Sequence, residues 1–168
     1  VRCKLDQGYQ VVVTGSNASL LSRELGTKLT GRHISRELFP FSFLEFCEFL
    51  GKEKNTDAVA DYLHLGGFPQ YLQFNEDEIL NALINDILYR DIIVRFGIRD
   101  ERSMKRLLLF LAGNVGNLIT ASKLKQSLEV KSTATVQEYL SHLEQAYVIS
   151  LLPKFSYSYK TQLANPRK

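Results

Sequence analysis

The sequence predicts a mainly α-helical chain with a small α/β segment near its start, and three observations predict it. Apolar residues recur at helical spacing after residue 76, as in Ile79, Leu80, Leu83 and Ile84, which is typical of an amphipathic helix. A β-branched run at residues 9–14 (YQVVVT) stops at a Gly-Ser-Asn turn and indicates a short buried strand. The last third has the order helix, turn, helix and hairpin, which is the outline of a winged helix.

Composition excludes several classes of protein. The chain has 168 residues, 45% apolar and 23% charged, so it suits one domain or two small ones and is not disordered by composition. Its net charge of +3 is mild and gives only a weak indication of an anionic partner. No apolar run approaches the roughly 20 residues of a membrane span. Cys3 and Cys47 form no paired motif, so we expect a reduced, cytoplasmic protein without membrane contact.

The start of the chain carries the strand signals. Ser16 or Asn17 follows the first predicted strand and can cap the next helix. Residues 34–39 are a second candidate strand, which Pro40 ends. The chain begins with Val1 rather than Met, as expected of a fragment of a larger protein or of a processed chain.

The middle of the chain is expected to be helical. Ser42 and Glu45 form a capping-box pattern for a helix that ends at Gly51. Further helices are expected over residues 57–65, from residue 76 and from about residue 100, with a Gly-Gly-Phe-Pro turn at residues 66–69.

In the last third, Thr120 can cap a helix and residues 129–131 form a turn. Ser132 or Thr133 then begins a longer helix. Residues 148–152 and 155–159 are expected to pair as the hairpin of the winged helix.

Three groups of short motifs carry a resemblance to a known family. The first is TGSN at residues 14–17 with LTGR at 29–32 and LFPFSFLEF at 38–46. The second is GGFPQY at residues 66–71 with YRDII at 89–93. The third is YLSHLEQAY at residues 139–147 with PKFSY at 153–157 and NPRK at 165–168. In this order the chain resembles the AAA-type ATPases of bacteria and archaea that join a P-loop domain, a winged-helix region and a C-terminal restriction-nuclease-like domain.

The resemblance implies how the chain is divided. Residues 1–52 correspond to the end of the P-loop nucleotide domain, 53–114 to a helical lid-like region and 115–168 to a winged-helix-like region. No G-x-x-x-x-G-K-[ST] motif is present, so the phosphate-binding loop and the acidic Mg²⁺-supporting strand are expected before residue 1, and the nuclease-like domain after residue 168. ATP and Mg²⁺ are then cofactors of the full-length parent. We expect this chain alone to bind ATP weakly or not at all and not to hydrolyse it, because phosphoryl transfer depends on the missing groups.

The same resemblance gives two catalytic candidates. It makes the turn of Thr14, Ser16 and Asn17 a nucleotide sensor, with Ser16 as the catalytic candidate, because ligands bind at the carboxyl ends of strands in open α/β sheets. It makes Arg32 a candidate arginine finger, which stabilises charge on the transferred phosphoryl group in cis or in trans. The simpler interpretations are a helix cap for Ser16 and Asn17 and a solvated or ion-paired side chain for Arg32.

Other patterns favour structural roles. The aromatic segment at residues 39–46 is interpreted as core with a capped helix, rather than as a docking surface for the lid or a neighbouring subunit. Asp86, Arg90 and Asp91 are expected to pair on a helix face, and a catalytic carboxylate pair has little support. No His or Cys lies at zinc-ligand spacing, so no metal site is expected.

The winged-helix-like segment is a DNA-binding candidate. The start of its second helix offers Lys131, Ser132, Thr133, Thr135 and Gln137, the residue types that recognition helices use. Glu138 and Glu144 oppose phosphate contacts, and the tail adds basic residues at 154, 160, 167 and 168.

Two functions stay open from the sequence. The first is an internal section of an AAA-type ATPase whose partners are the remainder of the parent and, through exposed strand edges and apolar surface, further copies of itself. The second is a stand-alone winged-helix module that binds DNA or another protein and never contacts ATP.

Overall fold

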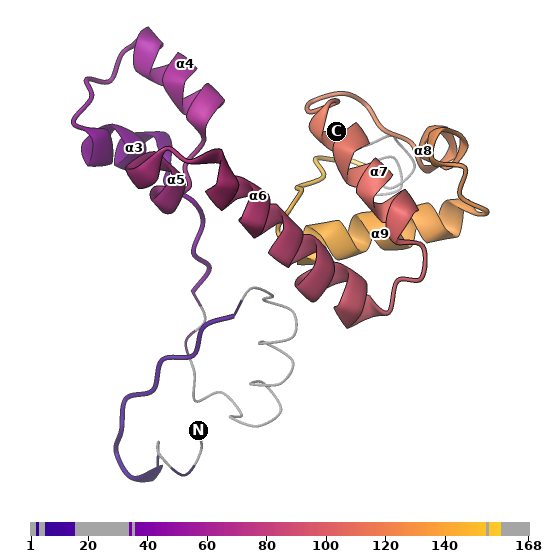
Figure 1. The fold of residues 1–168 in the computed structure, drawn as a ribbon, viewed down its shortest axis with the longest axis horizontal. Helices are drawn as coiled ribbons and strands as arrows, with labels where there is room; N and C mark the ends of the chain where they lie inside the picture. The colour runs from indigo at the N-terminus through magenta and orange to yellow at the C-terminus, as the bar shows by residue number, and fades with distance from the viewer. Residues whose placement is uncertain (1–2, 4–5, 16–33, 35, 154, 159–168) are drawn as a thin grey trace. The chain divides into compact units, whose positions relative to one another are not determined.

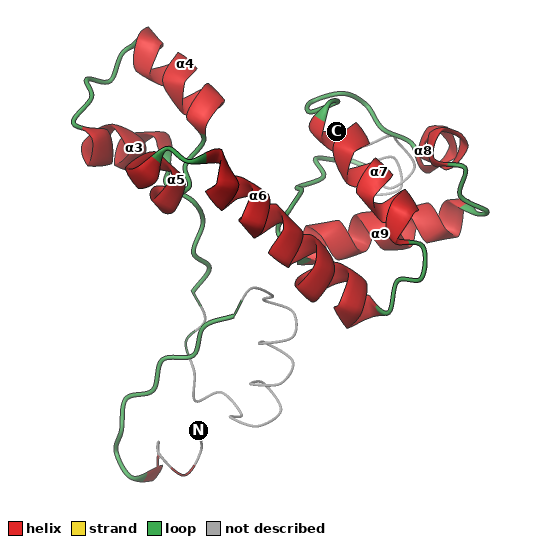
Figure 2. Ribbon diagram, viewed as in Figure 1, coloured by secondary structure: helices red, strands yellow, loops and turns green. Residues whose placement is uncertain are grey.

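The computed structural model describes residues 3, 6–15, 34, 36–153 and 155–158, and these are mainly helical (Figure 1; Figure 2). The mainly α fold class is therefore confirmed. The helices are α3 (Phe43–Leu50), α4 (Thr56–Leu65), α5 (Pro69–Phe74), α6 (Asp77–Asp86), the π-helix η1 (Ile87–Val94), α7 (Glu101–Ala112), α8 (Ala121–Leu128) and α9 (Thr133–Gln145). They fall into two compact units, Thr30–Asp86 and the combination of Val1–Leu29 with Ile87–Lys168.

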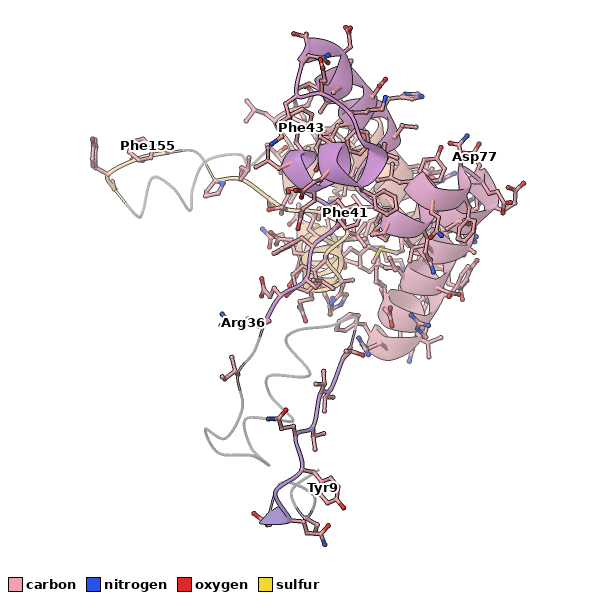
Figure 3. The ribbon with its side chains drawn as sticks, turned by 90° about the vertical axis from the view of Figure 1, so that its left-hand side faces the viewer. Tyr9, Arg36, Phe41, Phe43, Asp77 and Phe155 are labelled. Carbon is pink, nitrogen blue, oxygen red and sulfur yellow. The ribbon has the colours of Figure 1, made fainter. Side chains whose placement is uncertain are left out.

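The predicted strands near the start do not form in the described residues. Residues 9–15 have no regular secondary structure and are exposed, as is visible around Tyr9 in Figure 3. Residues 34 and 36–39 are also irregular and exposed. A strand is held by hydrogen bonds to a neighbouring strand, and no described segment is a strand that provides them. Within the described residues, the strand predictions at 9–14 and 34–39 were therefore wrong; residue 35 lies outside them.

Helix α3 has the predicted capping box. The Ser42 N–H donates to Glu45 Oε2 at 2.8 Å, and the Glu45 N–H donates to Ser42 Oγ at 3.4 Å. The backbone and hydroxyl hydrogen bonds from Ser42 hold the pKa of the Glu45 carboxyl below its ordinary value. Gly51 ends the helix at φ 63°, a left-handed conformation that glycine adopts without a Cβ clash.

The first unit has a small core beneath α3 and α4. Phe46, Cys47 and Ala58 are buried there, and the ring of Tyr62 lies 5.2 Å from that of Phe46. The Tyr62 hydroxyl donates to the Phe41 carbonyl at 2.8 Å, which ties the chain before α3 to α4. The interpretation of the aromatic segment as core with a capped helix is confirmed for its later part.

Two helical features were not predicted. Helix α5 begins directly at Pro69, because proline at the first helical position has its φ preset and lacks only an N–H that would stay unpaired. Residues 87–94 form a π-helix whose buried side chains include Leu88 and Ile92. Within it Arg90 donates to both carboxylate oxygens of Asp91, at 3.1 and 3.2 Å, so this part of the predicted helix-face pairing is confirmed.

A larger core joins η1, α7, α8 and α9, and Figure 1 labels the last three of these helices. Asp100 caps α7 by accepting from the Ser103 N–H at 3.0 Å, and hydrogen bonding from the side chain and then the backbone of Ser103 lowers the pKa of the Asp100 carboxyl. Helix α7 packs on α8, and α8 packs on α9. The side chains buried completely in this core are Ile92, Met104, Leu107, Leu124, Val136 and Leu143.

None of the described helices is both long and apolar enough to cross a lipid bilayer.

Candidate functional site

The candidate site is the helix-turn-helix that α8 and α9 form on α7. Thr120 caps α8 by accepting from the Lys123 N–H at 3.3 Å. Glu129 ends α8 in the left-handed region at φ 57°, and Val130 turns inward, only 8% exposed. A left-handed residue between two capped helices redirects the chain sharply. The predicted order of helix, turn and helix is therefore present.

Helix α9 packs on the core through its inner face. Val136, Leu140 and Leu143 recur at helical spacing and are buried, so they fix the rotation of the helix about its axis. That rotation decides which of its side chains reach solvent. Thr133, Ala134, Gln137 and Ser141 are exposed as a result.

The structure separates the five predicted DNA-contact residues into two groups. Ser132 and Thr135 serve the helix cap, since Ser132 Oγ accepts from the Thr135 N–H at 3.1 Å and lies 2.9 Å from Thr135 Oγ1. Both side chains are partly buried there. Lys131, Thr133 and Gln137 are exposed at the start of α9. These three are the ones free to meet a ligand.

Charge is distributed unevenly along the chain, which the whole-chain value conceals. Residues 87–168 hold 13 Lys and Arg against 6 Asp and Glu, a net charge of +7. Residues 30–86 hold 4 against 10, a net charge of −6. Between residues 95 and 131 alone, eight basic residues accompany three acidic ones. This difference in net charge between segments is visible in the sequence, but the net charge of the whole chain does not reveal it.

One side of α9 carries an aromatic contact. The ring of His142 stacks on that of Phe96, with centroids 3.7 Å apart and planes inclined by 12°. Burial lowers the pKa of His142, against a smaller opposing effect of Glu138. His142 Nδ1 is buried and has no hydrogen-bond partner in the described part of the chain. The imidazole of His142 therefore serves mainly as an apolar packing surface, and its stacking on Phe96 joins α9 to the segment after η1.

The predicted wing is not formed in the described residues. Residues 148–153 and 155–158 contain no strand, so the hairpin prediction was wrong there; residue 159 lies outside the described part. Glu144 Oε1 accepts from the Leu151 N–H at 3.3 Å, which anchors the chain after α9 through a side chain instead of a backbone ladder. The basic positions 154, 160, 167 and 168 lie outside the described residues.

Most of the residues predicted to contact a nucleotide are not among the described residues. Ser16, Asn17 and Arg32 lie outside the described residues. Thr14 is described, and it is exposed on irregular backbone. Its sensor role stays a prediction. No group of three or more potential metal ligands occurs among the residues that the structure describes.

Two known families match the chain. Residues 56–168 match a family described as a domain of unknown function (DUF8612). Residues 1–47 match the AAA domain. The AAA match covers every nucleotide candidate and supports interpreting the chain as part of an AAA-type ATPase. It does not extend to the helix-turn-helix, which lies within the other family.

The chain is also similar to two longer curated proteins. An uncharacterized protein of Haemophilus influenzae is 36% identical over 149 residues, which cover 82% of this chain and 37% of that protein. An uncharacterized protein of Methanocaldococcus jannaschii is 32% identical over 180 residues, which cover 96% of this chain and 41% of that protein. The chain thus spans about two fifths of the length of these relatives. No solved structure matches it.

Proposed function

Since the chain belongs to the family described as a domain of unknown function (DUF8612) and carries an AAA-domain match before that region, we propose that it is a section of an AAA-type ATPase. In this proposal residues 1–47 contribute to a nucleotide site, and α7 to α9 form a helix-turn-helix module of the same protein. The remainder of the ATPase is its first partner. The AAA-domain match over residues 1–47 carries the proposal.

The sensor and finger roles follow from the chemistry of phosphoryl transfer. That reaction is accelerated by positioning the attacking water and neutralising charge on the transferred group. In the proposal, Ser16 with Thr14 and Asn17 contacts the γ-phosphate or the water, and Arg32 supplies positive charge. The phosphate-binding loop and Mg²⁺ belong to the rest of the parent, so ATP binds there and this chain alone does not turn it over.

Turnover of ATP by the full-length parent tests these roles. Ser16→Ala and Arg32→Ala are compared with Ser22→Ala and Arg36→Ala, which make the same changes at positions without a proposed role. Loss of an arginine finger lowers kcat by roughly 10³-fold or more. We therefore expect Arg32→Ala to lower the kcat of ATP hydrolysis greatly while nucleotide binding is retained. Wild-type turnover in both site variants would return these residues to structural roles.

The helix-turn-helix supports a second candidate function, DNA contact. Lys131, Thr133 and Gln137 are exposed at the start of α9, where recognition helices place their base-reading side chains. The region around them is basic, unlike residues 30–86, which are acidic. Gln137 has the amide that pairs with adenine in the major groove.

Binding of the 168-residue chain to a fluorescent DNA duplex tests this second function. We expect Gln137→Ala to weaken binding and the exposed change Gln73→Ala, in the other compact unit, to leave it as in wild type. If no nucleic acid binds, the module is better interpreted as a protein-protein spacer within the ATPase.

A further inference from the structure

The segment between η1 and α7 lies along one side of α9. Phe96 stacks on His142 in the C-terminal half of α9. Four residues later, Asp100 is close enough to Tyr139 to contribute, after burial, to raising the pKa of that phenol. The Ile98 N–H donates to the Ile93 carbonyl at 3.0 Å, which holds the intervening backbone against η1. Residues 96–100 are thus fixed beside the middle and end of α9.

Arginines border this contact. Arg95 and Arg99 are exposed, and neither forms an ion pair with any residue that the structure describes. Arg95 is next in sequence to Phe96, which stacks on His142 of α9, and Arg99 is next to Asp100, whose charge acts on Tyr139 of the same helix. Two uncompensated guanidinium groups therefore lie beside the helix that offers Thr133 and Gln137 to solvent.

A second basic group precedes the same helix in the chain. Lys123 and Lys125 on α8 and Lys131 in the turn are exposed. They too are absent from the ion pairs of the described residues. Helix α9 has 13 residues and is therefore about 20 Å long, which exceeds the roughly 12 Å width of a DNA major groove. Cations at its start and along its side can then reach phosphates while its exposed face lies in the groove.

The exposed face of α9 favours a duplex over a single strand. Proteins that bind single strands present aromatic rings on which bases stack. The exposed residues of α9 between Thr133 and Ser141 carry no ring, since Tyr139 is only 7% exposed. Small and amide side chains suit the edges of paired bases instead.

We propose that α9 binds the major groove of double-stranded DNA, with Lys123, Lys125 and Lys131 contacting phosphates near its start and Arg95 and Arg99 contacting phosphates along its side. This rests on the DNA-contact function proposed above and adds the duplex as substrate class and two arginines outside the helix-turn-helix as backbone contacts. In this proposal the two arginines fix the position and orientation of the duplex on the protein through its phosphates, and they do not contribute to sequence specificity.

The salt dependence of binding tests the arginine contacts. Fluorescence anisotropy of a short labelled duplex of mixed sequence is measured with the 168-residue chain between about 50 and 200 mM salt. Each phosphate contact contributes roughly 0.9 to the slope of log K against log salt. The double variant Arg95→Gln/Arg99→Gln is therefore expected to show a slope that is shallower by about 1.8 than that of wild type. It is also expected to bind the duplex roughly tenfold more weakly at the lower salt concentration.

A matched control separates local contact from total charge. Arg36→Gln/Lys54→Gln removes two exposed charges from the acidic segment and is expected to keep the wild-type slope. Circular dichroism checks that both double variants retain their helices. A wild-type slope for Arg95→Gln/Arg99→Gln, with DNA still bound, overturns the arginine contacts and leaves the DNA function standing.

Two further outcomes decide the rest of the proposal. Tighter binding of the labelled single strand than of the duplex overturns the choice of substrate class. Absence of binding to either nucleic acid removes the DNA function and the arginine contacts together.

Discussion

The backbone of Phe41 is pressed against that of Gly67. The Phe41 N–H donates to the Gly67 carbonyl at 2.7 Å, and a Cβ on Gly67 would lie 2.2 Å from the Phe41 carbonyl oxygen. Figure 3 shows Phe41 at the point where the chain enters α3. Glycine is needed at position 67 for close approach rather than for a left-handed turn.

Gly67→Ala is therefore expected to destabilise the Thr30–Asp86 unit. The obstruction is backbone, which cannot rotate away as a side chain can, so we expect a loss of about 1–3 kcal/mol. Gly113→Ala is the matched control, because the nearest atom to its Cβ is at 3.6 Å and its φ of −78° suits alanine. That change is expected to stabilise by roughly 0.4–1 kcal/mol through the unfolded state. Chemical denaturation measures both, and equal stabilities for the two variants would contradict the close approach.

Folding stability is expected to fall in mild acid because of His142. Its pKa is lowered from the ordinary 6.5 in the folded chain, so the unfolded chain binds the proton more readily. The stabilisation is complete above pH 6.5 and is lost as the pH drops through that value towards the folded pKa. Thermal unfolding of wild type and His142→Phe between neutral and mildly acidic pH measures this.

The His142→Phe variant is expected to lose that part of the pH dependence, because phenylalanine can keep the stack on Phe96 without titrating. His64→Phe, at an exposed position of α4, is its control and is expected to behave like wild type. An unchanged pH dependence in His142→Phe would show that other groups cause it.

Ser132 and Thr133 are neighbours with different expected roles. Ser132→Ala removes the oxygen that accepts from the Thr135 N–H and is expected to cost about 1 kcal/mol of stability. Thr133 is exposed, so Thr133→Ala is expected to change stability by less than about 0.5 kcal/mol while weakening binding to duplex DNA. Denaturation and anisotropy on both variants separate the cap from the contact. Equal losses of stability in the two would contradict this division.

Glu138 is expected to oppose DNA binding. Its side chain is 66% exposed on α9 and places a negative charge beside the proposed phosphate positions. Glu138→Gln is therefore expected to raise affinity for duplex DNA by roughly two- to fivefold at low salt, as measured by anisotropy. Glu53→Gln, exposed in the other unit, is the control. Weaker binding by Glu138→Gln would place the duplex away from this face.

Parts of the candidate site were accessible from the sequence, and parts were not. Lys131, Thr133 and Gln137 were identified because a capped helix with a clear apolar stripe fixes which positions face out. Ser132 and Thr135 were named with them; the structure shows that Ser132 Oγ accepts from the Thr135 N–H and lies 2.9 Å from Thr135 Oγ1, and a DNA contact by either residue stays a prediction. Arg95 and Arg99 were missed because their place beside α9 depends on the stacking of Phe96 on a residue far along the chain.

The sequence by itself determined where most helices begin and end. Ser42 and Thr120 cap helices as predicted, and Ser132 rather than the alternative Thr133 caps α9, because a cap joins residues only three apart. Tertiary structure decided the remainder. The runs at residues 9–14 and 148–152 have strand-like composition but no strand beside them among the described residues, and a strand exists only where a distant segment supplies its hydrogen bonds. The approach of Phe41 to Gly67 and of Phe96 to His142 likewise depends on packing between segments remote in sequence, which local patterns do not encode.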